Sequence, residues 1–557
     1  MPSLLQNLRR EYVPTLPDLL KDINTLSISP SNNLLEKHSP LEKIFPKTYQ
    51  QPRLSIVKDK IRKNSPLRIG FVFSGGQAAG GHNVVTGLFD ALKRMHEGSR
   101  LWGFIDGPKG IIENNAKEIT YEILAPYRNQ GGFDLVGSGR TKIETKEQFE
   151  AAAQTVKELE LDGLVIVGGD DSNTNAALLA EFFLEVGIRT KVVGVPKTID
   201  GDLKNEHIEI SFGFDSATKT FSEIIGNILT DALSAKKYTF FVKLMGRTAS
   251  HIAMECAMQT HANLTFIGEE VQTERKTLKE ITCEITDLVI ERSKQGKDYG
   301  VILIPEGLIE FIPEFKQLIS ELNKLLAADE RHALNIDKLN QKNEKIDYVY
   351  PLLTEESKEC FSSLPEEIQI QLLLDRDPHG NVQVSKIDTE RLLIETVKSE
   401  LANRHKKGQH PVKFSPQPLF CGYEGRACLP SNFDANYCYA LGHVAALLIN
   451  GGATGYMCSI SHLELPTCNW QVAGIPLVSM IHLEERHGKM KPVIKKALVK
   501  MEDRLFQQFA AVRDQWRLDD DYVNPGPIQF FGPESLTDCK TWTLMEAKKH
   551  DLDPPID

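Results

Sequence analysis

The stretch that decides the fold runs from Leu67 to Gly81 and reads LRIGFVFSGGQAAGG. Its first half is a short apolar run, typical of a strand that is buried on both faces, and its second half is rich in glycine. A helix-like segment, Asn83–Met95, follows directly. A buried strand, a glycine-rich turn and a helix are the opening of an α/β unit with a parallel sheet.

The same order recurs further along the chain. The apolar run Gly163–Val167 ends in Gly-Gly-Asp-Asp, and the run Lys191–Val195 ends in Pro-Lys. Helix-like segments at Thr145–Leu159 and Asn175–Val186 accompany them. This alternation predicts a parallel sheet covered on both faces. Because ligands bind at the carboxyl ends of such strands, we expect the three polar clusters that follow the strands to converge.

A second series of strand-like runs indicates another α/β unit that faces the first. The runs are Tyr238–Leu244, Leu264–Ile267 and Gly300–Ile304. The expected fold class is therefore α/β, with two Rossmann-like parallel-sheet domains, a largely helical insertion and an N-terminal extension. The expected boundaries are 1–66 for the extension, 67–235 for the first domain joined by part of the C-terminal region, 236–307 with 401–480 for the second domain, 308–400 for the insertion and 481–557 for a helical C-terminal region.

Composition limits the function. The chain has 557 residues and a net charge of −11, which argues against a general nucleic-acid or membrane-surface partner. Its nine cysteines never have Cys-x-x-Cys spacing, as expected for reduced thiols in a cytoplasmic protein. The N-terminus carries Arg9, Arg10 and Glu11 where a signal peptide would be apolar. The most apolar window, Tyr439–Met457, is broken by His443 and several glycines, so no membrane span is expected.

Each polar cluster can be explained either by a structural role, such as a turn or a helix cap, or by a chemical role in binding phosphate or metal. The glycines around Gly75 and Gly76 let backbone N–H groups approach a phosphate, although a tight turn without a ligand is about equally common. Asp170 and Asp171 follow two glycines at a strand end, where capping of the next helix is the commoner role. Ser172 or the next residue could provide that cap, which leaves a carboxylate for Mg²⁺.

The third cluster, Pro196-Lys-Thr-Ile-Asp-Gly-Asp202, adds a lysine, a hydroxyl and two more carboxylates. A loop capped by aspartates is as good a reading of this segment in isolation. Together with the preceding clusters, however, it places four aspartates and one lysine at one sheet edge, where unpaired carboxylates would repel one another. A bound cation with a phosphate partner is therefore indicated, and phosphoryl transfer needs this set of groups.

These segments resemble the phosphofructokinase family. The similarity lies in the Gly-Gly loop, the Gly-Gly-Asp-x-Ser loop and the Thr-Ile-Asp-x-Asp loop, in that order, and it extends over roughly residues 67–480. Three further motifs match, and they are Met245-Gly246-Arg247, Pro305-Glu306-Gly307 and Gly422-Tyr423-Glu424-Gly425-Arg426. The resemblance implies two α/β units with an active site in the cleft between them, the first binding the phosphoryl donor with magnesium and the second binding fructose 6-phosphate.

The resemblance also implies a role for each motif residue. Asp200 would be the base for the sugar 1-hydroxyl, with Thr198 and Asp202 arranging the site, and Asp170 would hold Mg²⁺. The donor phosphates would contact Gly75, Gly76, Arg140, Lys197 and Asp171. Arg247 would stabilise the transferred group, and the sugar phosphate would contact Thr198, Asp202, Met245, Gly246, Arg247, Glu306, Tyr423 and Arg426.

Two positions bear on the choice of donor. ATP-using members of the family typically carry glycine where this chain has Asp171 and Lys197, and both side chains would fill the space that a nucleotide needs. The pattern therefore resembles the long, pyrophosphate-dependent branch, whose reaction is expected to be reversible. The alternatives are an ATP-dependent enzyme and a silent regulatory subunit, although the latter should have lost part of the motif set. A dinucleotide-binding protein is disfavoured because Gly-x-Gly-x-x-Gly is absent from the first turn.

The expected partners are pyrophosphate and fructose 6-phosphate, with a further copy of the chain in a homodimer or larger homo-oligomer. ATP-using relatives bring arginines from a neighbouring subunit onto the 6-phosphate. At the approximately matching positions this chain has Tyr238 and Gln417, and Lys236, Lys237 and Lys243 are nearby candidates for that charge.

Overall fold

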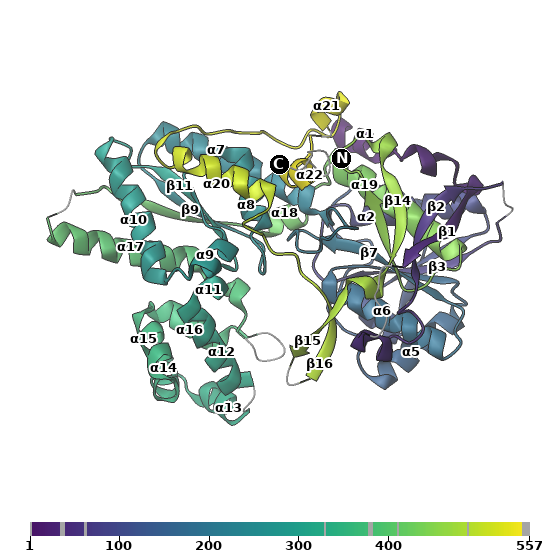
Figure 1. Ribbon diagram of the computed structural model, residues 1–557, viewed down its shortest axis with the longest axis horizontal. Coiled ribbons are helices and arrows are strands. Elements are labelled where there is room, and N and C mark those ends of the chain that lie inside the picture. Colours follow the sequence, from purple (N-terminus) through teal and green to yellow (C-terminus); the bar gives the residue numbers. More distant parts are fainter. Residues whose placement is uncertain are drawn as a thin grey trace, which may run out of the picture. The chain divides into compact units, whose positions relative to one another are not determined.

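The computed structural model describes residues 3–33, 39–60, 64–327, 330–376, 382–408, 411–486, 489–537 and 539–547. The chain divides into two compact units (Figure 1). Unit 1 comprises residues 1–220, 423–497 and 528–557, and unit 2 comprises residues 221–422 and 498–527. In the described residues, no helix is long and apolar enough to cross a membrane.

Unit 1 is built on a mixed sheet whose centre is parallel. Its order among the described residues is β1-β2-β14-β13-β7-β6-β3-β4-β5, with β8 paired to β7. The strands β4, β3, β6, β7 and β13 are mutually parallel, whereas β5 at one end and β14, β2 and β1 at the other end are joined by antiparallel pairs. The strands are β1 (Leu26–Asn33), β2 (Pro52–Lys58), β3 (Arg68–Ser74), β4 (Arg100–Phe104), β5 (Ala116–Ile119), β6 (Gly163–Gly168), β7 (Lys191–Thr198), β8 (Phe212–Gly213), β13 (Tyr456–Ser461) and β14 (Gln471–Pro476).

Helices cover both faces of this sheet, as the apolar strand runs predict. Figure 1 shows α5 (Lys146–Glu158) and α6 (Asp170–Glu185) on one side, and α2 (Gly81–Met95) and α19 (Asn432–Asn450) on the other. The helices α2 and α19 approach so closely that a Cβ on Gly87 would lie 2.1 Å from the carbonyl oxygen of Tyr439. This packing holds the glycine-rich start of α2 in place.

Residues after 422 depart from the expected domain boundaries. We expected residues 401–480 in the second unit, but β13 pairs in parallel with β7 and so belongs to the unit 1 sheet. The C-terminal region, expected to be helical, begins with a hairpin of β15 (Ile481–Arg486) and β16 (Lys489–Ile494). Apolar and polar residues alternate along its first strand, which is the strand pattern that the sequence-based expectation overlooked.

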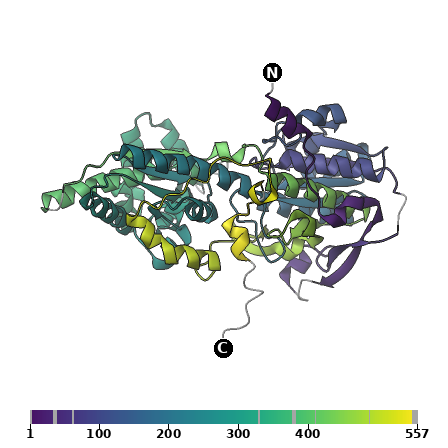
Figure 2. The same cartoon turned by 90° about the horizontal axis from the view of Figure 1, so that it is seen from above.

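Unit 2 contains a parallel sheet in the order β10-β11-β9-β12 among the described residues. Its strands are β9 (Thr239–Leu244), β10 (Leu264–Thr265), β11 (Gly300–Pro305) and β12 (Pro416–Cys421). The helices around the sheet include α7 (Phe214–Ala235, whose first residues belong to unit 1), α8 (His251–Thr260), α9 (Gly268–Glu274), α10 (Leu278–Lys294), α11 (Leu308–Phe311), α17 (Thr389–Lys406) and α20 (Arg504–Leu518). The helix α20, yellow in Figure 2, packs against α8 and α10.

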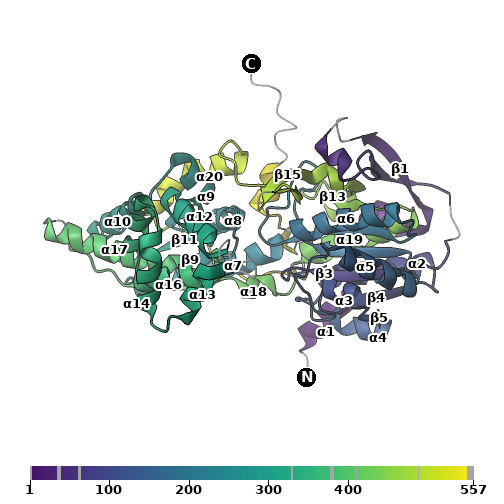
Figure 3. The same ribbon diagram turned by 90° about the horizontal axis from the view of Figure 1, so that it is seen from below.

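The insertion is helical, as the sequence predicts. Figure 3 shows its helices grouped within unit 2. They are α12 (Pro313–Ala327), α13 (Glu330–Lys338), α14 (Lys342–Val349), α15 (Glu355–Ser363) and α16 (Glu366–Leu374). Buried residues of α12, α15 and α16 share one hydrophobic core with the sheet strands β9 and β11, so the insertion extends the core of unit 2.

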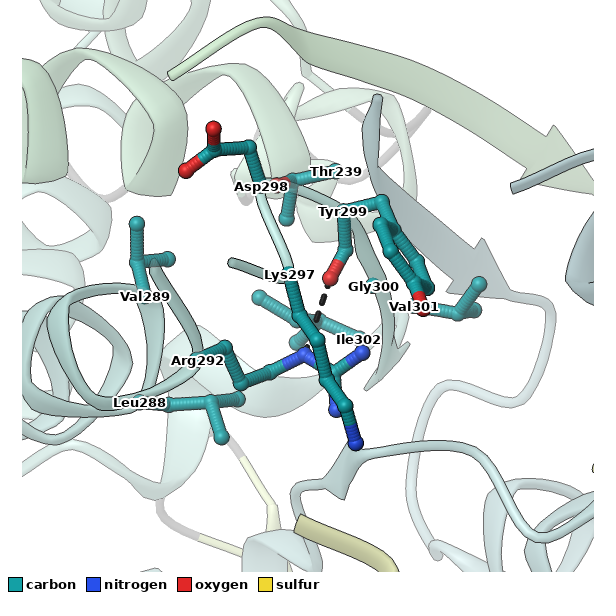
Figure 4. A pocket seen from close by; sticks show the side chains of 10 residues that line it. All are labelled: Thr239, Leu288, Val289, Arg292, Lys297, Asp298, Tyr299, Gly300, Val301 and Ile302. Carbon is teal, nitrogen blue, oxygen red and sulfur yellow. Dashed lines mark hydrogen bonds between the residues drawn. The ribbon is translucent and has the colours of Figure 1, made fainter. Parts of the chain in front are cut away.

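A buried arginine connects the C-terminal part of unit 2, residues 498–527, to the rest of that unit. Arg292 on α10 is almost fully buried beside a cavity of about 10 Å³, which is too small for a ligand (Figure 4). Its Nε donates to the carbonyl oxygen of Tyr299 over 2.8 Å, and its guanidinium pairs with Asp520 over the same distance. This site is therefore structural.

Candidate active site

The glycine-rich loop lies at the end of β3, at the carboxyl edge of the unit 1 sheet. Gly75 has a φ of 88°, a left-handed conformation that favours glycine, and its N–H donates to the carbonyl oxygen of Gly139 over 2.9 Å. This bond brings Arg140, the next residue, to the loop. A Cβ on Gly75 would lie 3.3 Å from the Nζ of Lys197. The first and third polar clusters thus meet, as the strand order predicts.

Lys197 lies beneath this loop and is 6% exposed. Its ammonium donates to the carbonyl oxygen of Gly76 over 2.8 Å. Burial lowers the pKa of Lys197 to about 8, an effect that Asp200 and Asp170 oppose. The guanidinium groups of Arg140 and Arg426 lower the pKa further. Three cations therefore converge on one partly dehydrated volume, which is an electrostatic environment suited to a polyanion.

The aspartates of the second cluster lie in the first turn of α6. Neither of them caps the helix, because the N-cap position belongs to Gly169, and glycine has no side chain that could accept a hydrogen bond there. Instead, Asn173 donates to the carbonyl oxygens of Gly168 and Gly169 over 2.6 Å and 2.9 Å. Asp171 pairs with Lys142 over 3.3 Å. An amide side chain thus orders the turn, and the Asp170 carboxylate is not needed to cap the helix.

The Thr198–Asp202 loop follows β7. Its turn is ordered by the Thr198 hydroxyl, which accepts a hydrogen bond from the Asp200 N–H over 3.1 Å. The carbonyl oxygen of Asp202 accepts from the N–H of Ala497 over 2.7 Å. Next to Ala497, the ammonium of Lys496 lies 3.6 Å from the carboxylates of both Asp170 and Asp202. The sequence-based assignment missed Lys496, because a lysine among several others reads as ordinary surface charge.

Tyr423 and Arg426 form the short helix α18 (Tyr423–Arg426) of unit 1. The guanidinium of Arg426 lies 4.8 Å from the ring centroid of Tyr423, which orients its planar donor groups. Its Nη1 lies 3.6 Å from the position that a Cβ on Gly76 would occupy. The structure therefore groups Arg426 with the glycine-rich loop.

The remaining motif residues meet at the carboxyl ends of β9 and β11 in unit 2. Glu306 is 3% exposed, and its carboxylate accepts a hydrogen bond from the Gly246 N–H over 3.0 Å. Met245 donates its N–H to the carbonyl oxygen of Cys421 over 2.9 Å. A Cβ on Gly307 would lie 1.9 Å from the carbonyl oxygen of Arg247, so the two motifs fit backbone against backbone. The parallel register of the two strands explains why motifs about 60 residues apart lie together.

Lys243 is one of the candidate replacements for the arginines that ATP-using relatives bring from a neighbouring subunit. In the structure it has a structural role instead. It is buried in β9, where its ammonium lies 3.0 Å from Glu390 and donates to the carbonyl oxygen of Ile387 over 3.1 Å. An ammonium paired in this way within the core of unit 2 is not available to a sugar phosphate.

The described residues contain no group of three or more His, Cys, Asp or Glu side chains that could hold a metal ion by themselves. The donor set nevertheless suits magnesium, which binds through one or two carboxylates and fills its other positions with water and phosphate oxygens. Asp170, at the end of β6 and beside the cation cluster, is such a carboxylate.

Comparisons with known proteins show the family of the chain. The family model described as phosphofructokinase matches residues 68–342. The chain belongs to the phosphofructokinase family. Within it, the chain is 50% identical to the pyrophosphate–fructose 6-phosphate 1-phosphotransferase subunit beta 1 of Arabidopsis thaliana, covering 98% of this chain and 94% of that protein. It is also 50% identical to the pyrophosphate–fructose 6-phosphate 1-phosphotransferase of Treponema pallidum, covering 97% and 96%.

A solved structure supports the fold. The pyrophosphate-dependent phosphofructokinase of Nitrosospira multiformis superposes with a TM-score of 0.54 at 15% identity, covering 84% of this chain and 96% of that one. The predicted family resemblance and the predicted α/β fold class are thus confirmed.

Proposed function

We propose that this chain transfers a phosphoryl group from pyrophosphate to the 1-hydroxyl of fructose 6-phosphate, giving fructose 1,6-bisphosphate and phosphate, in a reversible reaction. The observation that carries the proposal is the cation cluster under the glycine-rich loop, where Lys197 is joined by Arg140 and Arg426. The names of relatives about 50% identical over nearly the whole chain support the same donor and acceptor.

The donor site is proposed to hold pyrophosphate between charged side chains and backbone N–H groups. Lys197 fills the space below Gly76, where the smaller glycine of ATP-using relatives would leave room for a nucleotide. Asp171, paired with Lys142, occupies the rim of the same site. The short donor thus replaces the nucleotide, and the charges of Lys197 and Arg140 bind its phosphate oxygens.

The transfer step needs a base and a stabiliser of the moving charge. Asp200 takes the proton of the sugar 1-hydroxyl, with Thr198 and Asp202 ordering its loop. Arg247 stabilises the charge that develops on the transferred group, as expected for a preorganised cation. Magnesium, held by Asp170 and phosphate oxygens, would neutralise part of the donor charge. Phosphofructokinases generally use a divalent cation, and magnesium is the ion proposed here.

The acceptor sugar is proposed to bind to unit 2 through its hydroxyl groups. Glu306 is buried and accepts from the Gly246 N–H, and a carboxylate held in this way is proposed to accept from sugar hydroxyls as well. Met245 and Gly246 line the pocket. For Tyr423 and Arg426 the family resemblance implies binding of the 6-phosphate, and the position of Arg426 beside Gly76 supports a phosphate contact at the edge of the donor loop. We further propose a cytoplasmic homo-oligomer.

The test is formation of fructose 1,6-bisphosphate from fructose 6-phosphate and Mg²⁺, with pyrophosphate and ATP supplied in separate reactions. Turnover with pyrophosphate alone, and its reversal by phosphate, is the expected result. Turnover with ATP alone would overturn the donor assignment, and no turnover with either would favour the silent-subunit alternative.

A further inference from the structure

The segment that follows the β15–β16 hairpin enters the donor site of unit 1 and is fixed on both sides of Lys496. Before it, the Ile494 N–H donates to the Thr174 hydroxyl of α6 over 3.2 Å. After it, the Ala497 N–H donates to the carbonyl oxygen of Asp202 over 2.7 Å. One anchor thus lies one helical turn beyond Asp170, and the other lies on the loop of the proposed base. The backbone therefore holds Lys496 between the two carboxylates.

The ammonium of Lys496 lies close to both carboxylates. It lies 3.6 Å from Asp170 and 3.6 Å from Asp202, beyond the usual 2.7–3.2 Å of a nitrogen–oxygen hydrogen bond. The side chain of Asp202 is 7% exposed, whereas that of Lys496 is 31% exposed. An exposed surface pair would contribute little. Here, however, the carboxylates are partly desolvated and the lysine is held by its backbone, so its charge acts on the site at short range.

We propose that Lys496 is a further residue of the donor site, with two successive partners. In the site without metal it offsets the repulsion between Asp170 and Asp202 and competes with a cation for Asp170. In the site with bound pyrophosphate and metal, the same ammonium donates to a phosphate oxygen, because its flexible stem and three donors let it turn from carboxylate to phosphate. This inference rests on the proposed function of the site.

Loss of the Lys496 charge should change cation binding and pyrophosphate binding in opposite directions, which structural damage to the site would not do. Removal of the charge should strengthen binding of a divalent cation alone, because a competitor for Asp170 is lost. The same removal should weaken binding of pyrophosphate, because a phosphate contact is lost. A misfolded site would weaken both.

The experiment compares three variants of the full chain, which are Lys496→Met, Lys496→Arg and the matched control Lys495→Met. Lys495 is the exposed neighbour of Lys496, so its variant removes the same charge outside the site. Binding of Mn²⁺ alone is measured by electron paramagnetic resonance, and KM values for pyrophosphate and fructose 6-phosphate are measured at saturating Mg²⁺. Circular dichroism checks the folding of each variant, and Lys496→Gln replaces Lys496→Met if the latter is unfolded.

For Lys496→Met we expect Mn²⁺ to bind about threefold or more tightly than in wild type. The KM for pyrophosphate should rise by about 10-fold or more, as for loss of a charge-assisted hydrogen bond, while the KM for fructose 6-phosphate stays within about twofold. Lys496→Arg should restore most of both effects, and Lys495→Met should match wild type. Values for Lys496→Met that equal those of Lys495→Met, or weaker binding of both Mn²⁺ and pyrophosphate, would overturn the inference. Absence of turnover in wild type would instead contradict the proposed function, and the Mn²⁺ measurement would still be readable.

Discussion

Unit 1 and unit 2 position their motif residues by different means. In unit 1, charged side chains arrive from separate segments of the chain, and Lys197, Arg426 and Lys496 lie within a few ångströms of the loops they serve. In unit 2, one buried carboxylate, Glu306, orders a backbone loop, and Gly307 packs directly on the backbone of Arg247. The proposed donor residues of unit 1 therefore depend on charge, and the proposed acceptor residues of unit 2 depend on backbone fit. Each unit should respond to a different kind of substitution.

The largest effect is expected from removing a charge in unit 1 while keeping its shape. Asp200→Asn should lower kcat by about 10³-fold, because the loss of a general base costs about 10²–10⁴-fold. The KM for pyrophosphate should change little, and steady-state kinetics measures both values.

The matching change in unit 2 is Glu306→Gln, whose amide oxygen can still accept from the Gly246 N–H. It should raise the KM for fructose 6-phosphate by about 10-fold, while kcat falls less than in Asp200→Asn. Equal losses of kcat in the two variants would remove the proposed contrast between the units.

The next effect comes from adding a methyl group to glycines. In Gly307→Ala the new Cβ would lie 1.9 Å from the Arg247 carbonyl oxygen, so the backbone must move, at a cost of about 2–4 kcal/mol in unfolding free energy. In the unit 1 counterpart, Gly169→Ala, the Cβ would lie 3.4 Å from the Lys197 carbonyl oxygen, and we expect a loss below about 1 kcal/mol. Chemical denaturation measures both, and a cost for Gly169→Ala as large as that for Gly307→Ala would contradict the assignment of backbone fit to unit 2.

The dependence of activity on pH tests whether the proposed donor residues of unit 1 act through the charge of Lys197. Because burial lowers the pKa of Lys197 to about 8, its ammonium loses its proton as the pH rises through that value. The kcat/KM for pyrophosphate should therefore fall above about pH 8 in wild type. In Lys197→Arg the guanidinium stays charged, so the part of the fall that is due to this residue should disappear. A profile that is identical in the two proteins would show that Lys197 does not bind the donor in its charged form.

A separate pH effect concerns stability within unit 1. Burial and the neighbouring Asp215 raise the pKa of Asp434 to about 7, from an ordinary value of 3.8. Between these pH values the folded chain binds more protons at this site than the unfolded chain, so this residue's contribution to stability decreases as the pH rises from about 4 to about 7. Asp434→Asn should flatten that part of the stability profile, which thermal unfolding at a series of pH values measures. An unchanged slope would contradict the raised pKa.

The sequence predicted most of the fold because buried strands and glycine-rich turns are local signals. It placed Gly75, Asp170 and Lys197 at one sheet edge, and the structure brings their loops together. It did not predict Lys496, because only the folded hairpin carries this lysine to the Asp202 loop. Its placement of residues 423–480 in the second unit was wrong. The pairing of β13 with β7 is set by long-range packing, which leaves no local signal in the sequence.

The most direct test of the donor assignment is the ratio of kcat/KM for pyrophosphate to that for ATP, in wild type and in the Asp171→Gly, Lys197→Gly double variant. Wild type should turn over with pyrophosphate, and the double variant should lose most of that activity, because it lacks the ammonium that contacts the Gly76 carbonyl oxygen. Unchanged pyrophosphate kinetics in the double variant would contradict the claim that these two side chains select the donor.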